Sequence, residues 1–334
     1  MILSRAPVRF SLGGGGTDLP SYCEEHGGFL VAASIDKYIH VLANRTFHRG
    51  LLLKYSKTEH VDRVEDIQHP LFREAIKLTR VSDGLELVSV ADLPSNSGLG
   101  SSSSFTVALL NALHAYQREF VATEQLAREA CQIEIDILKE PIGKQDQYIS
   151  AYGGITAFTF EPRAAGGGVT VERVPMKTEV IEDLEVNLLV FFSGIERKAS
   201  DVLGEQKKTI TSNKDDAVQR MHRIKALGYE TKRLLMNGTI DDYGDLLHEH
   251  WMNKRKLASN MTDGTIDEHY DAARKAGALG GKLMGAGGGG FFVFYVRPES
   301  RRSVSETMVA RGLRPLRFRF DFDGARISAN FQRS

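Results

Sequence analysis

Glycine is distributed unevenly along this chain, and its clusters restrict the possible folds more than any other feature of the sequence. The chain has 32 glycines among 334 residues, and they gather at residues 13–16, 98–100, 166–168 and 285–290. Glycine adopts positive φ without a steric penalty and lets a ligand approach the backbone closely. Because the clusters are flanked by apolar runs, we interpret them as more than flexible linkers.

The composition is that of a globular protein. The apolar fraction is 42% and the charged fraction 26%, which are ordinary values, and 334 residues favour two domains. With 43 basic and 43 acidic residues, the chain has no basic excess with which to bind nucleic acid or an anionic membrane. Its two cysteines, Cys23 and Cys131, lack CxxC spacing, which indicates reduced thiols rather than a disulfide or a zinc site.

The chain carries no recognisable targeting segment. Residues 1–5 lack the basic region and apolar core of a signal peptide. No apolar stretch approaches the roughly 20 residues needed to cross a bilayer. We therefore expect a cytoplasmic protein.

In the first half of the chain, apolar patterns predict strands followed by two helices. The predicted strands are rich in Val, Ile and Phe and cover residues 9–12, 29–44, 51–55, 85–90 and 155–160. Apolar residues at 3.6 spacing predict a helix from Ser102 to about Arg118. A second helix is expected from Thr123, as its N-cap, to Leu138, before Pro141.

The second half mixes strands and helices in the same way. A buried strand is predicted over 186–192, polar helices between 199 and 276, two strands around the last glycine cluster, a helix from Glu299, and strands near 313–322 and 325–327. This pattern predicts an α+β protein with two lobes. Residues 161–168 are the weakest stretch, so we expect an N-terminal domain of residues 1–165 and a C-terminal domain of residues 166–334.

The segment LPSNSGLGSSSS, residues 93–104, lies just before the first predicted helix. A Gly/Ser-rich loop there presents free N–H groups, and the helix dipole adds about half a positive charge. This arrangement suits the phosphates of a nucleotide. The simpler alternative is a serine-rich helix cap without a ligand. A Walker A loop is excluded because no lysine follows the second glycine, and a dinucleotide fingerprint because the third glycine is missing.

Two further segments place glycine turns beside polar residues. In RAPVRFSLGGGGTDLP, residues 5–20, a predicted strand carries Arg9 and the turn carries Thr17 and Asp18; a hairpin with a capping Asp is the alternative. In KLMGAGGGGFF, residues 282–292, five glycines surround one alanine between apolar strands. A tight turn needs only one or two glycines, so we expect something to lie against this backbone.

Together, and in this order, the three segments resemble the three signature motifs of the GHMP kinases (galactokinase, homoserine kinase, mevalonate kinase and phosphomevalonate kinase). The resemblance spans nearly the whole chain. It implies a two-lobed α+β fold with the active site in the cleft between the lobes, and phosphoryl transfer that uses ATP and Mg²⁺. The implied partners are ATP and a sugar phosphate, not nucleic acid or membrane. The oligomeric state is left open, a homodimer included.

Within the family, the first two segments resemble the bacterial kinases that act on D-glycero-D-manno-heptose 7-phosphate, as do GKQDQYISAYGG at residues 143–154 and HEHWMNKRKLAS at residues 248–259. This resemblance implies phosphorylation of the anomeric C1 hydroxyl to the 1,7-bisphosphate, for nucleotide-activated heptose and surface polysaccharide. A fucose- or hexosamine-type sugar 1-kinase shares much of the pattern and stays an alternative. So does a non-catalytic sugar sensor on the same fold, whereas the sugar-type first segment disfavours a decarboxylase of the mevalonate branch.

The resemblance also implies roles for individual residues. Asp146 would accept the proton of the sugar hydroxyl, and Arg9 would pair with it and screen charge on the transferred group. Ser102 and Glu134 would bind Mg²⁺. The alternatives are a surface Asp at 146 and a solvated helix face at Glu134. The implied nucleotide-binding residues are Pro94, Ser95, Ser97, Gly98, Leu99, Gly100, Ser101, Ser102 and Ser103, and the implied substrate-binding residues are Gly15, Thr17, Asp18, Gly287 and Arg197.

The chain departs from the galactokinase pattern in its first motif. Gly14 and Gly15 stand where that motif has Glu and His, so we expect a roomier pocket, compatible with a seven-carbon sugar rather than galactose. His248 and His250 have no apparent third ligand, so we interpret them as a helical surface pair and not a metal site. A substrate phosphate also needs cations, for which the candidates are Arg197, Lys198, Lys254, Arg255 and Lys256, each with a solvated surface charge as the alternative.

Overall fold

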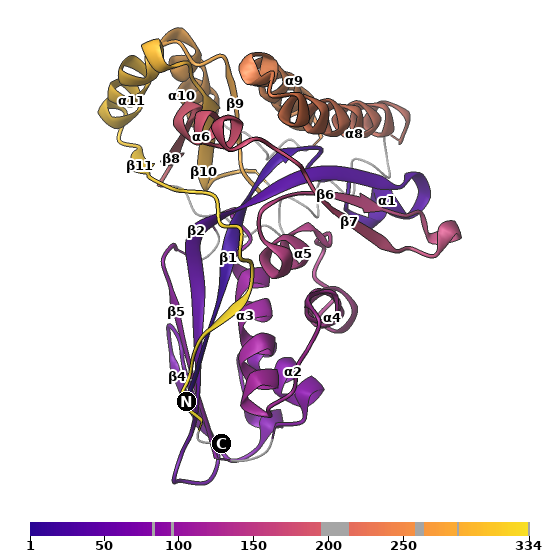
Figure 1. Cartoon of the computed structure of the whole chain (residues 1–334), viewed down its shortest axis with the longest axis vertical. Helices are drawn as coiled ribbons and strands as arrows, with labels where there is room; N and C mark the ends of the chain where they lie inside the picture. The colour runs from indigo at the N-terminus through magenta and orange to yellow at the C-terminus, as the bar shows by residue number, and fades with distance from the viewer. Residues whose placement is uncertain (82–83, 95–96, 195–213, 258–263, 286, 333–334) are drawn as a thin grey trace.

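The computed structural model describes residues 1–81, 84–94, 97–194, 214–257, 264–285 and 287–332. The chain forms two lobes, each built on one sheet (Figure 1). The described part of the larger sheet has the strand order β12-β1-β2-β5-β3-β4, with β6 and β7 beside one end of β2. The smaller sheet has the order β11-β8-β10-β9. The predicted α+β class is therefore confirmed.

A long antiparallel pair forms the spine of the first lobe. Strand β1 (Ile2–Gly13) pairs with β2 (Gly28–Arg45) along nearly its whole length. One half of β2 pairs with β5 (Leu85–Ala91), and the other half with β6 (Ile155–Phe160). The remaining strands of this sheet are β3 (Leu51–Lys54), β4 (Thr58–Val61), β7 (Val169–Arg173) and β12 (Arg326–Asn330).

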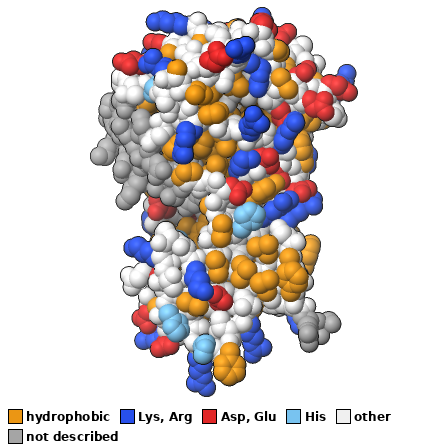
Figure 2. All heavy atoms as spheres, turned by 90° about the vertical axis from the view of Figure 1, so that its left-hand side faces the viewer, with side chains coloured by type: hydrophobic (Ala, Val, Ile, Leu, Met, Phe, Trp, Pro, Cys, Tyr) orange, Lys and Arg blue, Asp and Glu red, His pale blue; other side chains and the backbone are white. Residues whose placement is uncertain are grey.

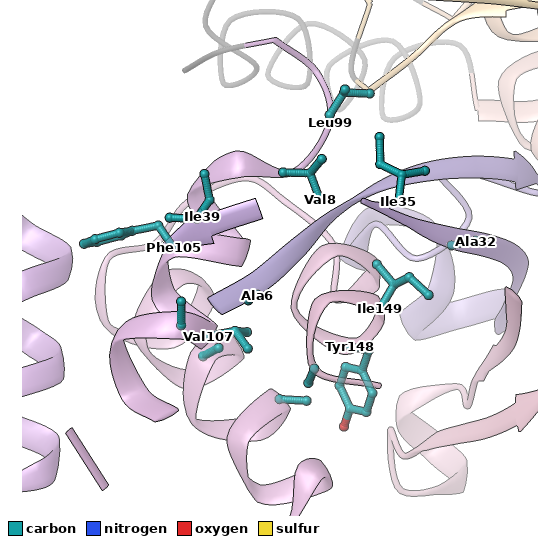
Figure 3. Packing of buried hydrophobic residues seen from close by; sticks show 14 of the residues in the cluster. Ala6, Val8, Ala32, Ile35, Ile39, Leu99, Phe105, Val107, Tyr148 and Ile149 are labelled. Atoms are coloured by element: carbon teal, nitrogen blue, oxygen red, sulfur yellow. The ribbon is translucent and has the colours of Figure 1, made fainter. Parts of the chain in front are cut away.

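Helices cover one face of this sheet. They are α2 (Pro70–Thr79), α3 (Ser101–Tyr116), α4 (Thr123–Cys131) and α5 (Gln145–Tyr152) (Figure 1). Residues 103–110 of α3 are all buried, the polar Ser103, Ser104 and Thr106 included. Figure 3 shows side chains from the strands and from α3 and α5 packed into one cluster, among them Ala6, Val107 and Ile149.

At the end of the larger sheet formed by β5, β3 and β4, no described helix lies on the other face (Figure 1), whereas at the opposite end Phe29 of β2 stacks on Tyr229 of α8 (Lys214–Asn237). Hydrophobic side chains gather on this face of the first lobe (Figure 2). Val90 of β5 is 59% exposed, whereas Leu85 and Leu87, which point to the other face of the same strand, are buried. The sheet is thus open on one face only toward its β5 end, because residues 6–13 of β1 and 28–35 of β2 are all buried.

The second lobe has its own hydrophobic core. Its strands are β8 (Leu188–Phe192), β9 (Gly280–Leu283), β10 (Phe291–Tyr295) and β11 (Arg314–Leu316). Its helices are α6 (Thr178–Asn187), α8 (Lys214–Asn237), α9 (Tyr243–Lys254), α10 (Gly264–Lys275) and α11 (Arg301–Ala310). Trp251 of α9 and Tyr270 of α10 pack with Phe292 and Phe294 of β10. Among the described residues, no helix combines the length and apolar character needed to span a bilayer.

Several sequence predictions need adjustment. The helix expected from Ser102 is α3, and the one expected from Thr123 is α4, but Thr123 lies inside the helix and Ala122 precedes it as N-cap. Its last turn, Gln132–Ile137, is a π-helix. The strand expected from residue 186 starts at Leu188, because α6 occupies the residues before it. The helices α1 (Pro20–His26), α2 and α5 were not predicted.

The division between the sheets differs from the expected boundary after residue 165. Strand β7 pairs with β6 and so belongs to the larger sheet. The last strand, β12, also returns to that sheet and pairs with β1 (Figure 1). No local pattern in a five-residue strand specifies such a long-range partner, so the two sheets do not correspond to two consecutive segments of the chain.

Candidate active site

An arginine and an aspartate form a fork where three segments of the first lobe meet. Nε and Nη2 of Arg9, on β1, donate to Oδ1 and Oδ2 of Asp146 at 2.7 and 2.8 Å. Nη1 of Arg9 donates to the carbonyl oxygen of Gly98 at 2.6 Å. Arg9 is 4% exposed, whereas the Asp146 side chain is 24% exposed. The two-point contact fixes the orientation of a carboxylate that solvent still reaches, so the surface alternative for Asp146 is wrong.

Asp146 lies in the first turn of α5, beside the start of α3. A Cβ atom at Gly100, the N-cap of α3, would lie 3.1 Å from Oδ2 of Asp146. Gly100 has φ +79°, and no side chain caps the first turn of α3. Ser102 in that turn is exposed. The free amides at the start of α3 therefore lie beside the carboxylate. Free amides at a helix start are an arrangement that binds anions.

The late glycine segment packs on the loop before α3, backbone against backbone. Gly98 has φ +80° and Gly285 φ +71°, and a Cβ at Gly285 would lie 2.6 Å from both Cα and the carbonyl oxygen of Gly98. A Cβ at Gly290 would overlap the carbonyl oxygen of Ser97. These glycines are thus required where the two lobes meet, and part of what lies against the late segment is the earlier one. Gly287 follows in the same loop, with φ +105°.

Asp18 is buried at the start of α5. Its Oδ2 accepts a hydrogen bond from the backbone N–H of Gln145 at 3.0 Å, and a Cβ at Gly143 would overlap its carboxylate. Burial raises the pKa of Asp18, and the hydrogen bond from Gln145 opposes this shift. Asp18 therefore caps the helix that carries Asp146, a contact that only the tertiary structure reveals.

Two expectations about the first segment are wrong. The hydroxyl of Thr17 is fully buried between backbone groups of Gly14 and Phe29, so its side chain does not reach a substrate. The space expected at Gly14 and Gly15 is also filled. A Cβ at Gly14 would overlap the carbonyl oxygen of Phe29, and one at Gly15 would overlap Oγ of Ser11. These glycines allow close packing of the chain rather than a larger pocket.

Glu134 is buried at the inner side of the π-helix, a feature that is frequent at functional sites. It is 1% exposed, so the solvated-face alternative is wrong. Oγ of Ser102 donates to its Oε1 at 3.0 Å, and Nε2 of Gln147 donates to its Oε2 at 2.8 Å. Burial raises the pKa of Glu134 to about 7. One carboxylate and one hydroxyl are a donor set that suits Mg²⁺ bound mainly to phosphates and water.

We predict that replacing Glu134 with Gln weakens the binding of Mg²⁺ without unfolding the protein. The amide keeps the size of the side chain and removes a carboxylate whose ionisation burial disfavours. Metal-free thermal stability should therefore be equal or higher, while the apparent Mg²⁺ affinity falls by at least about tenfold. Calorimetric titration of Mg²⁺ into the nucleotide-bound protein measures this. Asp136→Asn, on the exposed side of the same turn, should leave the affinity unchanged; an equal loss in both variants would contradict the assignment.

The candidate phosphate-binding cations differ in their burial and in their partners. Arg255 pairs with Asp267 at 2.8 Å, and Lys256 is exposed. Lys254 is 7% exposed, and its amine donates to the carbonyl oxygen of Gly285. Lys282 of β9, which the sequence analysis did not single out, is 2% exposed. The signal in the sequence that could have identified it is a single lysine within a predicted apolar strand. Of the other predicted residues, Ser95, Arg197 and Lys198 lie outside the described residues.

The two predicted surface histidines differ. His248 shares a hydrogen bond between its Nδ1 and the hydroxyl of Tyr270 at 2.8 Å. His250 is 2% exposed, so the surface interpretation is wrong for it. No cluster of three or more His, Cys, Asp or Glu side chains suited to a metal occurs among the described residues.

Comparison with known proteins shows similarity over both lobes. Residues 68–154 match the profile of the GHMP kinases N terminal domain, and residues 231–312 match that of the GHMP kinases C terminal domain. The D-glycero-alpha-D-manno-heptose 7-phosphate kinase of Campylobacter jejuni is 27% identical over 319 residues, which cover 92% of this chain and 93% of that protein. The bifunctional fucokinase/GDP-fucose pyrophosphorylase of Arabidopsis thaliana is 26% identical over 85% of this chain, but the match covers only 29% of that larger protein.

A solved structure extends the similarity to the fold. The D-glycero-D-manno-heptose 1-phosphate kinase of Bacteroides thetaiotaomicron superposes with a TM-score of 0.81 and 25% identity, over 99% of this chain and 100% of that one. The descriptions of the two heptose kinases place the substrate phosphate on different carbons.

Proposed function

Because the chain belongs to the GHMP kinase family, we propose that it transfers the γ-phosphoryl group of ATP to the anomeric C1 hydroxyl of D-glycero-D-manno-heptose 7-phosphate. The products would be ADP and the 1,7-bisphosphate, a precursor of nucleotide-activated heptose for surface polysaccharide. The observation that carries the proposal is the Arg9–Asp146 fork beside the uncapped start of α3. It combines a fixed proton acceptor with an anion site, which are the parts that phosphoryl transfer requires.

The reaction assigns one task to each residue. Asp146 accepts the proton of the C1 hydroxyl while the hydroxyl oxygen forms its bond to the γ-phosphorus and the bond to the ADP oxygen breaks. Arg9 holds the Asp146 carboxylate in place through both oxygens. The amides at the start of α3 hold the phosphates of the nucleotide. When Mg²⁺ is bound with Ser102 and Glu134, it neutralises phosphate charge.

The choice of heptose 7-phosphate rests on the relatives and on the sequence segments that resemble them. The C. jejuni relative matches this chain over nearly the full length of both proteins. A fucose-type sugar 1-kinase is the second candidate, because the A. thaliana fucokinase is almost as similar in sequence. The first motif does not decide between them, since Gly14 and Gly15 serve packing.

Steady-state assays with heptose 7-phosphate and L-fucose test the substrate. We expect kcat/KM to be at least about a hundredfold higher for heptose 7-phosphate, since a site built for a phosphate leaves its charged groups unpaired with fucose. A preference for L-fucose would replace the first candidate by the second. Absence of turnover with both sugars, together with normal ATP binding, would support a non-catalytic sensor.

A further inference from the structure

Two buried lysines in the second lobe have no part in the reaction as described above. Lys254 ends α9 and is 7% exposed, and Lys282 lies in the middle of β9 and is 2% exposed. Lysine is almost never this buried unless it is paired. Their burial therefore requires an explanation in terms of a partner.

The elements that carry the lysines are packed closely together. A Cβ at Gly280 of β9 would overlap the carbonyl oxygen of Gly244 of α9 and would lie 2.9 Å from the backbone nitrogen of His248. Helix and strand thus touch through their backbones, and Lys254 is near enough to Lys282 to lower its pKa. The two cations belong to one buried group.

This group lies next to the reacting centre. The amine of Lys254 donates to Gly285, the residue whose Cα packs against Gly98, and Gly98 accepts from Arg9. Asp146 and Arg9 both perturb the pKa of Lys254, in opposite directions. A chain of direct contacts thus connects Lys254 with the Arg9–Asp146 fork.

Among the described residues, no carboxylate forms an ion pair with either lysine. Within the described part of the chain, no hydrogen bond or ion pair involves the Lys282 amine, and Lys254 has only a neutral carbonyl partner. The carboxylates that act on Lys254 are Asp18, which caps α5, and Asp146, which is already paired with Arg9. Burial lowers the pKa of Lys254 to about 8 and that of Lys282 far below its usual range.

A buried histidine beside the lysines is also unsatisfied. His250 lies one helical turn before Lys254, and neither of its ring nitrogens makes a hydrogen bond of good geometry. The Gly15 carbonyl is near enough to raise the pKa of His250, but burial and the two lysines outweigh it and lower that pKa well below the usual range. Buried polar groups without partners are costly, and a bound ligand is one reason why they persist.

We propose that Lys254 and Lys282 form a subsite that binds a phosphoryl dianion next to the Arg9–Asp146 fork. This inference rests on the proposed kinase function, because the phosphoryl group comes either from the γ-position of ATP or from the phosphate already present on the acceptor. In both cases the dianion supplies the negative charge that the buried lysines lack.

The first measurement separates a binding role from a structural role. Lys282→Met keeps the length of the side chain and removes a buried, unpaired charge, so the ligand-free melting temperature should stay equal or rise. Lys275→Met, at an exposed position on α10, is the control and should change neither stability nor binding. A strong fall in the ligand-free melting temperature of Lys282→Met, with unchanged ligand binding, would show a structural role and overturn the proposal.

The second measurement identifies the source of the phosphoryl group. Calorimetry gives the dissociation constants of MgADP and MgATP for the full chain and for Lys254→Met and Lys282→Met. If the γ-phosphoryl group is bound, the preference for ATP over ADP falls by at least about tenfold in both variants. If the acceptor phosphate is bound, that preference persists, and the ratio of kcat/KM for heptose 7-phosphate to that for unphosphorylated heptose falls instead. Lys254→Arg should recover part of either loss.

Failure of the subsite and failure of the proposed function give different results. If both ratios stay within about a factor of two of the wild-type values, the subsite does not exist, although the protein can still be a heptose kinase. If the wild-type protein phosphorylates no heptose at all, the proposed function fails. The comparison of ATP with ADP then still tests the subsite, with a smaller preference in the variants supporting it and an unchanged preference overturning it.

Discussion

Replacing Asp146 with Asn should reduce kcat by roughly a thousandfold, because the amide cannot accept the proton of the attacking hydroxyl. Affinity for ATP should stay within a factor of about two, since the phosphates are assigned to the start of α3 and not to this carboxylate. Steady-state assays with heptose 7-phosphate measure kcat, and calorimetric titration of ATP measures the affinity separately. Turnover at the wild-type rate would remove Asp146 from the mechanism.

The same substitution should also cost some stability. Arg9 is nearly inaccessible to solvent and has two of its three donor contacts with Asp146. An amide leaves the buried guanidinium without its counter-charge, which typically costs about 1–3 kcal/mol. Asp136→Asn is the matched control, because Asp136 is exposed and lies in the π-helix rather than at the fork. It should change neither kcat nor the melting temperature.

Replacing Gly285 with Ala should damage both folding and nucleotide binding. The residue has φ +71°, where a side chain is strained, and its Cβ would lie 2.6 Å from backbone atoms of Gly98. Neither backbone can move alone, because Arg9 holds the Gly98 carbonyl and Lys254 holds that of Gly285. We expect a loss of about 3 kcal/mol in the free energy of unfolding and at least a tenfold increase in the KM for ATP.

Gly167→Ala separates backbone strain from the close contact. Gly167 has φ +66°, and a Cβ there would have no atom within 4 Å. It therefore carries the same conformational penalty, about 1 kcal/mol, without the overlap, and the KM for ATP should not change. Thermal unfolding and ATP kinetics of both variants give the comparison. Equal effects in the two variants would show that the contact between the glycine segments is not what matters.

The site could be predicted from sequence where a residue belongs to a local motif. Arg9, Ser102 and Asp146 lie in or near glycine-rich segments with a recognisable pattern, and the structure brings Arg9 together with Asp146 and Ser102 together with Glu134. Glu134 needed the resemblance as well, because the sequence around it is rich in charge and reads as a solvated face. Its burial follows from the π-helix, which no simple periodicity predicts.

Residues whose roles depend on another segment could not be predicted. Thr17 stands in the motif, but its hydroxyl is used by the backbone of Gly14 and Phe29. Something was expected to lie against the late glycine segment, and at Gly285 and Gly290 it is the backbone of the loop before α3. Lys282 looks like an ordinary strand residue until β9 is placed against α9. Such roles follow from tertiary contacts between segments that no local sequence pattern pairs.

For the fold, too, elements with a strong local pattern could be predicted and elements that depend on other segments could not. Helix α3 and most strands were predicted because their apolar periodicity is strong and local. The short helices α1 and α5 begin or end at glycine or proline, and their few residues carry too weak a pattern. The return of β12 to the first sheet is a long-range pairing that depends on β1 and not on its own five residues.

Phosphorus NMR of the product tests the central claim most directly, since it reports which oxygen received the phosphoryl group. With ATP and D-glycero-D-manno-heptose 7-phosphate, we predict two sugar phosphate signals: the original one, and a new one coupled to the anomeric proton at C1. A new signal coupled to protons of another carbon, or formation of ADP without a new sugar phosphate, would contradict the account.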